Sequence, residues 1–148
     1  MNGHTGGQPY FALVDDDLHS ARLLMRMLAA HGAPTVSWQE NATLAMTELS
    51  AWLADDNASL PALVLVDLKS SSEATEQFVK QLRALPGASS LLVAAIAPTL
   101  ERAHRDALLD AGADAVFQRH ADLEFYRREA AAIISFWVRN QRLDAVGT

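Results

Sequence analysis

Short apolar runs alternate with longer amphipathic stretches five times along this chain. Two of the runs, at residues 62–66 and 91–96, contain no polar side chain, which is typical of strands buried on both faces of a sheet. In the stretches between the runs, apolar residues recur at helical spacing, as Ala21, Leu24 and Leu28 do. The alternation predicts an α/β fold, in which helices cover both faces of a doubly wound, five-stranded parallel sheet.

Capping and breaking residues indicate where these elements begin and end. Asp17, Asn41 and Asp122 each precede a predicted helix, where their side chains can accept hydrogen bonds from its first turn. Gly32 and Gly112 follow predicted helices, as glycine often does at helix C-termini. The predicted strands are 10–14, 35–38, 62–66, 91–96 and 115–117, and the predicted helices are 18–31, 42–53, 74–85, 100–111 and 123–143.

The composition indicates one folded domain, because half of the 148 residues are hydrophobic and only 20% are charged. The absence of cysteine excludes disulfides and thiolate chemistry. A net charge of −6 gives no basic footprint for nucleic acid, and no apolar run reaches the roughly 18 residues of a membrane span. We therefore expect a cytoplasmic protein with a polar, flexible leader at residues 1–8, a domain at 9–143 with an extended last helix, and a tail at 144–148.

Acidic side chains follow the first and the third predicted strands. Asp15, Asp16 and Asp17 come after the first strand and Asp67 after the third. Ligands of open parallel sheets bind beyond the carboxyl ends of the strands, which lie about 4.8 Å apart. If these two strands are adjacent, Asp15, Asp16 and Asp67 meet in one pocket, where a divalent cation relieves their mutual repulsion. Mg²⁺ suits such oxygen ligands and supports phosphoryl transfer to a carboxylate, whereas Asp17 is better explained as a helix cap.

Three segments carry a resemblance to a known family: FALVDDD at residues 11–17, LVLVDLK at 63–69 and LDAGAD at 109–114. Together with the fivefold alternation, they resemble the receiver domains of two-component response regulators. The similarity in layout covers residues 9–138. The resemblance implies a flavodoxin-like receiver fold with strand order 2-1-3-4-5.

The resemblance also implies roles for individual residues. Asp67 would accept a phosphoryl group from a sensor histidine kinase or a phosphotransfer protein. Asp16 and Asp67 would bind Mg²⁺ directly, with the backbone carbonyl of Lys69 as a third protein ligand, and Asp15 would act mainly through a metal-bound water. Such a domain signals through protein–protein contacts rather than as an enzyme, although it can catalyse its own phosphoryl transfer and dephosphorylation.

Two positions depart from the family pattern. Ala97 stands at the end of the fourth strand, where receivers carry the Thr or Ser hydroxyl that moves their switch, and Thr99 is better explained as a helix cap. Arg119 stands where the family has Lys, which keeps the charge but on a longer, planar group. The missing hydroxyl removes a charged hydrogen bond worth about 1.5–3 kcal/mol, so we expect phosphorylation to switch the fold weakly or differently.

Two other functions are open to the same residues. A pseudo-receiver would be an interaction module that phosphorylation does not switch, and metal binding separates it from a working receiver. A phosphatase of the haloacid dehalogenase type would use Asp15 and Asp17, but His19 stands where that motif has Thr or Val, and the later motifs of that class are missing.

The last predicted helix offers a candidate partner surface. Trp137 lies beyond the usual end of a receiver's last helix, and Ile134 and Val138 accompany it at helical spacing. If Trp137 is exposed, these residues suit a homodimer or an effector contact, and otherwise they pack onto their own domain. We expect neither nucleic acid nor a membrane among the partners of this chain.

Overall fold

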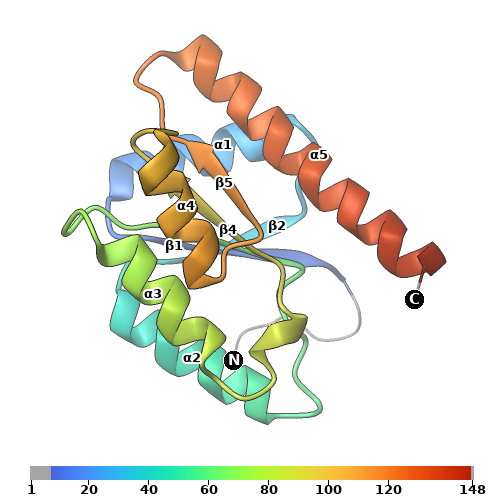
Figure 1. Ribbon diagram of the computed structural model, residues 1–148. Coiled ribbons are helices and arrows are strands. Elements are labelled where there is room, and N and C mark those ends of the chain that lie inside the picture. Colours follow the sequence, from blue (N-terminus) through green and yellow to red (C-terminus); the bar gives the residue numbers. More distant parts are fainter. Residues whose placement is uncertain (1–7, 148) are drawn as a thin grey trace.

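In the computed structural model, which describes residues 8–147 and the side chains of residues 8–141, five parallel strands form one sheet in the order β2-β1-β3-β4-β5 (Figure 1). Fold class and strand order are therefore confirmed. Except for residue 8, the predicted leader lies outside the described residues. The strands are β1 (Tyr10–Asp15), β2 (Thr35–Gln39), β3 (Leu63–Asp67), β4 (Val93–Ala97) and β5 (Ala115–Gln118), and the helices are α1 (Leu18–Ala30), α2 (Ala42–Ala54), α3 (Ala74–Arg83), η1 (a 3₁₀ turn, Ala88–Ser90), α4 (Arg102–Ala111) and α5 (Leu123–Gly147).

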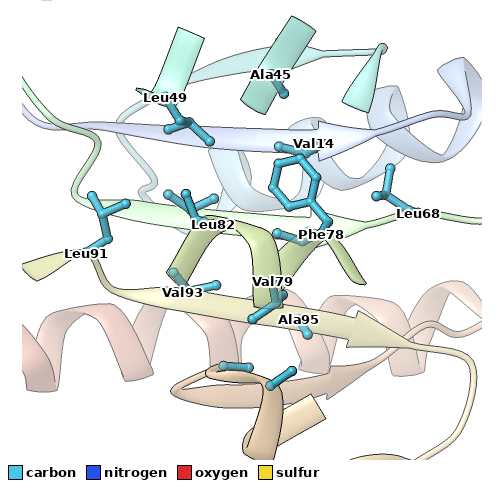
Figure 2. Packing of buried hydrophobic residues seen from close by; sticks show 14 of the residues in the cluster. Val14, Ala45, Leu49, Leu68, Phe78, Val79, Leu82, Leu91, Val93 and Ala95 are labelled. Atoms are coloured by element: carbon cyan, nitrogen blue, oxygen red, sulfur yellow. The ribbon is translucent and has the colours of Figure 1, made fainter. Parts of the chain in front are cut away.

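The core consists of two layers, one on each face of the sheet, because successive side chains of a strand point to opposite faces. Leu63 of β3 belongs to the layer covered by α1 and α5, and Val64 belongs to the layer covered by α2, α3 and α4. Figure 2 shows this second layer, with Phe78 and Leu82 of α3 packed over the strands. Both layers are apolar, which explains why β3 contains no polar residue before Asp67 at its carboxyl end.

The predicted caps place the starts of three helices correctly. Asp17, Asn41 and Asp122 each accept a hydrogen bond from a backbone N–H in the first turn of α1, α2 and α5, respectively. The fourth helix differs, because the Thr99 hydroxyl accepts a hydrogen bond from the backbone N–H of Glu101 at 3.1 Å and α4 begins only after that residue. Thr99 is therefore held in the turn that precedes α4.

The Ala-Gly-Ala turn after α4 needs its glycine. Gly112 has a φ of +123°, and a Cβ there would lie 2.4 Å from Cγ of Arg83. The Arg83 guanidinium donates to the Gly112 carbonyl at 2.8 Å and pairs with Asp114 at 2.7 Å. The glycine of the LDAGAD segment is therefore required by packing, since α3 lies directly against this turn.

The apolar residues of α5 pack onto their own domain. Trp137 is only 9% exposed and contacts Phe11 of β1 edge-on, with the ring centroids 5.0 Å apart. Ile134 and Val138 are half-buried against the same layer. An exposed tryptophan as the centre of a partner surface is therefore excluded at this position. The backbone of α5 is helical through Gly147, so residues 144–147, expected to form a tail, continue the helix. None of the helices within residues 8–147 is long and apolar enough to cross a membrane.

Candidate functional site

Asp15 and Asp67 lie side by side at the carboxyl edge of the sheet. Strands β1 and β3 are parallel neighbours, and the two aspartates are register partners at their ends. Both side chains are fully buried. The predicted adjacency of these two strands is confirmed, and it brings two carboxylates together beneath the loops that follow the strands.

The ammonium group of Lys69 lies between these two carboxylates. Its Nζ donates to Asp15 Oδ1 at 2.7 Å and to the backbone oxygen of Asp67 at 3.1 Å, and it lies 3.2 Å from Asp67 Oδ2. The Lys69 side chain is 21% exposed, so its charge is largely withdrawn from solvent. The resemblance implied a role only for the backbone carbonyl of Lys69 and none for its side chain. A lysine two residues after a buried aspartate was the signal available, because its stem is long enough to fold back.

Arg119 covers the other side of Asp67. Its Nη2 and Nε atoms donate to Asp67 Oδ1 at 2.6 and 3.1 Å, and the side chain is 26% exposed. The backbone N–H of Arg119 donates to the carbonyl oxygen of Ala97 at 2.7 Å, which fixes the start of this segment against β4. The Ala97 side chain is buried in the layer under α2, α3 and α4, so this position supplies no hydroxyl to Asp67.

Asp16 has different partners from the other two aspartates. Its carboxylate accepts hydrogen bonds from the backbone N–H groups of Lys69 at 3.0 Å and Ser70 at 3.1 Å, and so ties β1 to the loop after β3. Within the part of the chain that the structure describes, no three His, Asp or Glu side chains converge on a position for a metal ion.

This arrangement differs from the expected magnesium site. The expectation was that Asp15, Asp16 and Asp67 share one ion, but the Lys69 ammonium group stands between two of these carboxylates and the third is held by backbone N–H groups. As they are arranged here, these residues do not fit Mg²⁺, which prefers several oxygen ligands around one position.

The charges of Asp15 and Asp67 are balanced without any added ion. Asp15 and Asp67 carry two negative charges, and Lys69 and Arg119 carry two positive charges within hydrogen-bonding distance of them. We call these four residues the charge cluster. Burial raises the pKa of the Asp15 carboxyl above its ordinary value of 3.8, and the hydrogen bond from Lys69 opposes that rise. Asp15 Oδ2 also accepts a hydrogen bond from the Ser20 hydroxyl at 3.0 Å.

A small pocket opens beside the charge cluster. Its volume is about 250 Å³, and Lys69 and Arg119 contribute to its wall together with Ser71, Ser72 and His104. The pocket therefore presents cationic and hydroxyl groups, which are donors for an anion. The Asp67 carboxylate itself is fully buried, and both cationic side chains that contact it contribute to the wall of this pocket.

Residues from other elements lie close to the charge cluster, and no sequence motif pointed to them. Trp38 at the end of β2 donates its Nε1–H to the backbone oxygen of Asp15 at 2.8 Å. Tyr126 of α5 is buried, and the negative charge of Asp67 contributes to raising the pKa of its hydroxyl. His120 Nε2 lies 3.1 Å from Glu129 Oε1 of α5.

The two tyrosines of the chain provide a prediction for alkaline pH. Burial raises the pKa of both Tyr10 and Tyr126 to about 12, and the charges of Glu48 and Asp67, respectively, add to the rise. Their contribution to stability is fully present below the unfolded-state pKa of 10.0 and is lost as the pH rises through about 12. We expect the tyrosinate absorbance of the folded protein to appear near pH 12 and that of the denatured protein near pH 10. Ionisation of either residue in the folded protein near its ordinary pKa would contradict its burial.

Comparison with known proteins identifies the fold. No protein-family model matches the chain, and no curated protein matches it by sequence. Solved structures do match. The Mn²⁺-bound form of the response regulator Rcp1 has a TM-score of 0.72 at 18% identity, and the alignment covers 87% of this chain and 94% of that chain.

Two further structures agree with this result. The phosphorylated cyanobacterial phytochrome response regulator RcpA has a TM-score of 0.70 at 20% identity, covering 89% of this chain and 95% of that chain. A response regulator receiver domain from Rhodospirillum rubrum has a TM-score of 0.67 at 18% identity, covering 87% of this chain and 93% of that chain. The chain therefore has the fold of response regulator receiver domains over most of its length.

Proposed function

We propose that this chain is a cytoplasmic receiver domain of two-component signalling, which accepts a phosphoryl group on Asp67 and signals through protein–protein contacts. The observation that carries the proposal is the place of Asp67 at the carboxyl end of β3, with the Arg119 guanidinium on its Oδ1 at 2.6 Å beside an open pocket. The fold supports it, since RcpA is a response regulator whose structure contains the phosphorylated form.

The transfer that we propose needs a donor with a phosphohistidine, on a sensor histidine kinase or a phosphotransfer protein. An oxygen of the Asp67 carboxylate attacks phosphorus, the P–N bond breaks, and its electron pair stays on the imidazole nitrogen, which then takes up a proton. The product is an aspartyl phosphate on Asp67. Arg119 and Lys69, which line the pocket, can offset the charge of the entering phosphoryl group.

Magnesium binding by Asp15, Asp16 and Asp67, with the Lys69 carbonyl, stays a prediction that this proposal does not require. The Rcp1 structure contains Mn²⁺, which supports a divalent ion in a protein of this fold. In this chain Lys69 and Arg119 already supply two positive charges at the carboxylates.

A second candidate function is a pseudo-receiver, an interaction module that is not switched by phosphorylation. The observation that favours it is the burial of Asp67, whose carboxylate is fully enclosed and flanked by both cations of the charge cluster. Phosphoryl transfer requires an oxygen of Asp67 to become accessible, and the contacts with Arg119 and Lys69 oppose this. In a pseudo-receiver these contacts would be permanent and would act only on stability.

Incubation with acetyl phosphate separates the two candidates. We expect the wild-type protein to gain the mass of one phosphoryl group, and we expect the Asp67→Asn variant, measured alongside, to gain none. Each reaction is run with MgCl₂ and with EDTA, and peptide mapping locates the modification. A wild-type protein that gains no mass in either buffer, while a working receiver domain does so in parallel, would leave the pseudo-receiver as the function.

A further inference from the structure

We propose that the ammonium group of Lys69 is a built-in cation, which takes the position of a divalent metal ion between Asp15 and Asp67 and makes the site independent of metal. This inference deepens the proposed function and rests on it only where phosphoryl transfer is concerned. It concerns a side chain whose position the sequence did not predict.

The contacts of Lys69 place its ammonium group where a shared metal ion would lie. An ammonium group has three N–H donors, and two of them are used here on Asp15 Oδ1 at 2.7 Å and the Asp67 backbone oxygen at 3.1 Å. Asp67 Oδ2 lies 3.2 Å from the same nitrogen, is buried and accepts no hydrogen bond in the described part of the chain. The oxygens that would face a shared ion thus surround Nζ. A metal ion can occupy this position only if the ammonium group leaves it.

The charge cluster is already balanced in charge. The four members of the charge cluster sum to zero, and Asp15 and Asp67 are fully buried. A divalent ion added to this cluster would give it two excess positive charges, with the Asp16 carboxylate as the nearby group of opposite charge, in a region largely withdrawn from water, where excess charge is costly. Removal of Lys69 leaves a net negative charge instead, and this favours a cation.

The Asp16 carboxylate is already held by backbone hydrogen bonds. Its carboxylate oxygens accept the backbone N–H groups of Lys69 and Ser70, at the start of the loop after β3. Direct metal coordination by Asp16 would have to compete with these hydrogen bonds. The loop after β3 therefore holds the Asp16 carboxylate through backbone hydrogen bonds, and the Lys69 side chain fills the space between Asp15 and Asp67.

A titration with MnCl₂ and MgCl₂ tests the inference on the full chain. We compare the wild type with Lys69→Ala, and we use Lys80→Ala as a matched control, because Lys80 is exposed on α3 and is the only other lysine of the chain. Bound Mn²⁺ is counted from the loss of the free-ion electron paramagnetic resonance signal, and the melting temperature Tm is followed in parallel.

We expect the wild type and Lys80→Ala to show no rise in Tm with either salt. We expect Lys69→Ala to bind one Mn²⁺ at least about tenfold more tightly than the wild type and to gain several degrees in Tm from it. If the wild type binds the ion as well as Lys69→Ala does, or if neither protein binds it, the inference is overturned. The Lys69→Met variant, which keeps the bulk of the side chain without its charge, replaces Lys69→Ala if the latter does not fold.

The phosphorylation experiment in MgCl₂ and in EDTA, read together with the metal titration, distinguishes failure of this inference from failure of the proposed function. An adduct on Asp67 that forms equally in EDTA and in MgCl₂ supports both proposals. An adduct that forms only with MgCl₂ supports the phosphoacceptor function and overturns the role of Lys69. If no adduct forms in any buffer, the phosphoacceptor function fails, and the metal titration still decides the role of Lys69.

Discussion

Replacing Asp67 by asparagine is expected to lower the free energy of unfolding by about 2–4 kcal/mol at neutral pH. The carboxylate is fully buried and contacts two cations, Arg119 at 2.6 Å and Lys69 at 3.2 Å. Asparagine has nearly the same shape but removes the charge, so both cations lose a partner. Because their side chains are 26% and 21% exposed, water compensates part of the loss, and we place the effect toward the lower end of values for broken buried ion pairs.

The sign of this effect is more informative than its size. In a pocket of clustered carboxylates with no internal cation, removal of one negative charge relieves repulsion and stabilises the fold. In the charge cluster it removes attraction. Urea denaturation measures the difference, with Asp110→Asn on the exposed face of α4 as the control, for which we expect a change within about 0.5 kcal/mol. A more stable Asp67→Asn variant would show that Lys69 and Arg119 do not neutralise Asp67 in solution.

Replacing Lys69 by methionine is expected to destabilise the fold by a similar amount, about 2–4 kcal/mol at neutral pH. Asp15 and Asp67 would then face each other as buried like charges, with Arg119 on one oxygen of Asp67 as their remaining cationic partner in the charge cluster. A second change, Asp15→Asn, removes that repulsion. We therefore expect the double variant to be more stable than the sum of the two single effects predicts, by about 0.5–3 kcal/mol. Additive effects in urea denaturation would mean that Lys69 and Asp15 do not interact.

The same variant has a defined pH dependence. Burial raises the pKa of Asp15 and the Lys69 hydrogen bond lowers it, so removal of Lys69 lets the pKa rise further. A carboxyl whose folded-state pKa is raised contributes stability that is present below its unfolded value of 3.8 and is lost as the pH rises through the folded pKa. The destabilisation of Lys69→Met relative to the wild type should therefore be smaller in acid than at neutral pH.

The fold was predictable because it depends on features that a sequence displays directly. The period of the apolar residues distinguishes strands from helices, and parallel strands place their carboxyl ends at one edge. Asp15 and Asp67, each directly after a predicted strand, are register partners at this edge. Asp17, Asn41 and Asp122 cap helices because capping depends on residues only a few positions away.

The parts that could not be predicted depend on where long side chains go after the chain has folded. Lys69 and Arg119 have several rotatable bonds each, and only the buried carboxylates of other elements fix their positions. Trp137 lies at helical spacing whether it faces solvent or the core, and the contact with Phe11 decides between them. The position of Asp16 was missed because backbone N–H groups of a distant loop compete for its carboxylate, which no local pattern reveals.

A crystal structure of the protein grown with MnCl₂ shows whether Lys69 or a metal ion lies between Asp15 and Asp67, because the anomalous scattering of manganese marks each bound ion. We expect the Nζ of Lys69 between Asp15 and Asp67, with no manganese at these carboxylates. A manganese ion coordinated by Asp16 and Asp67, with the Lys69 side chain displaced into solvent, would contradict this expectation.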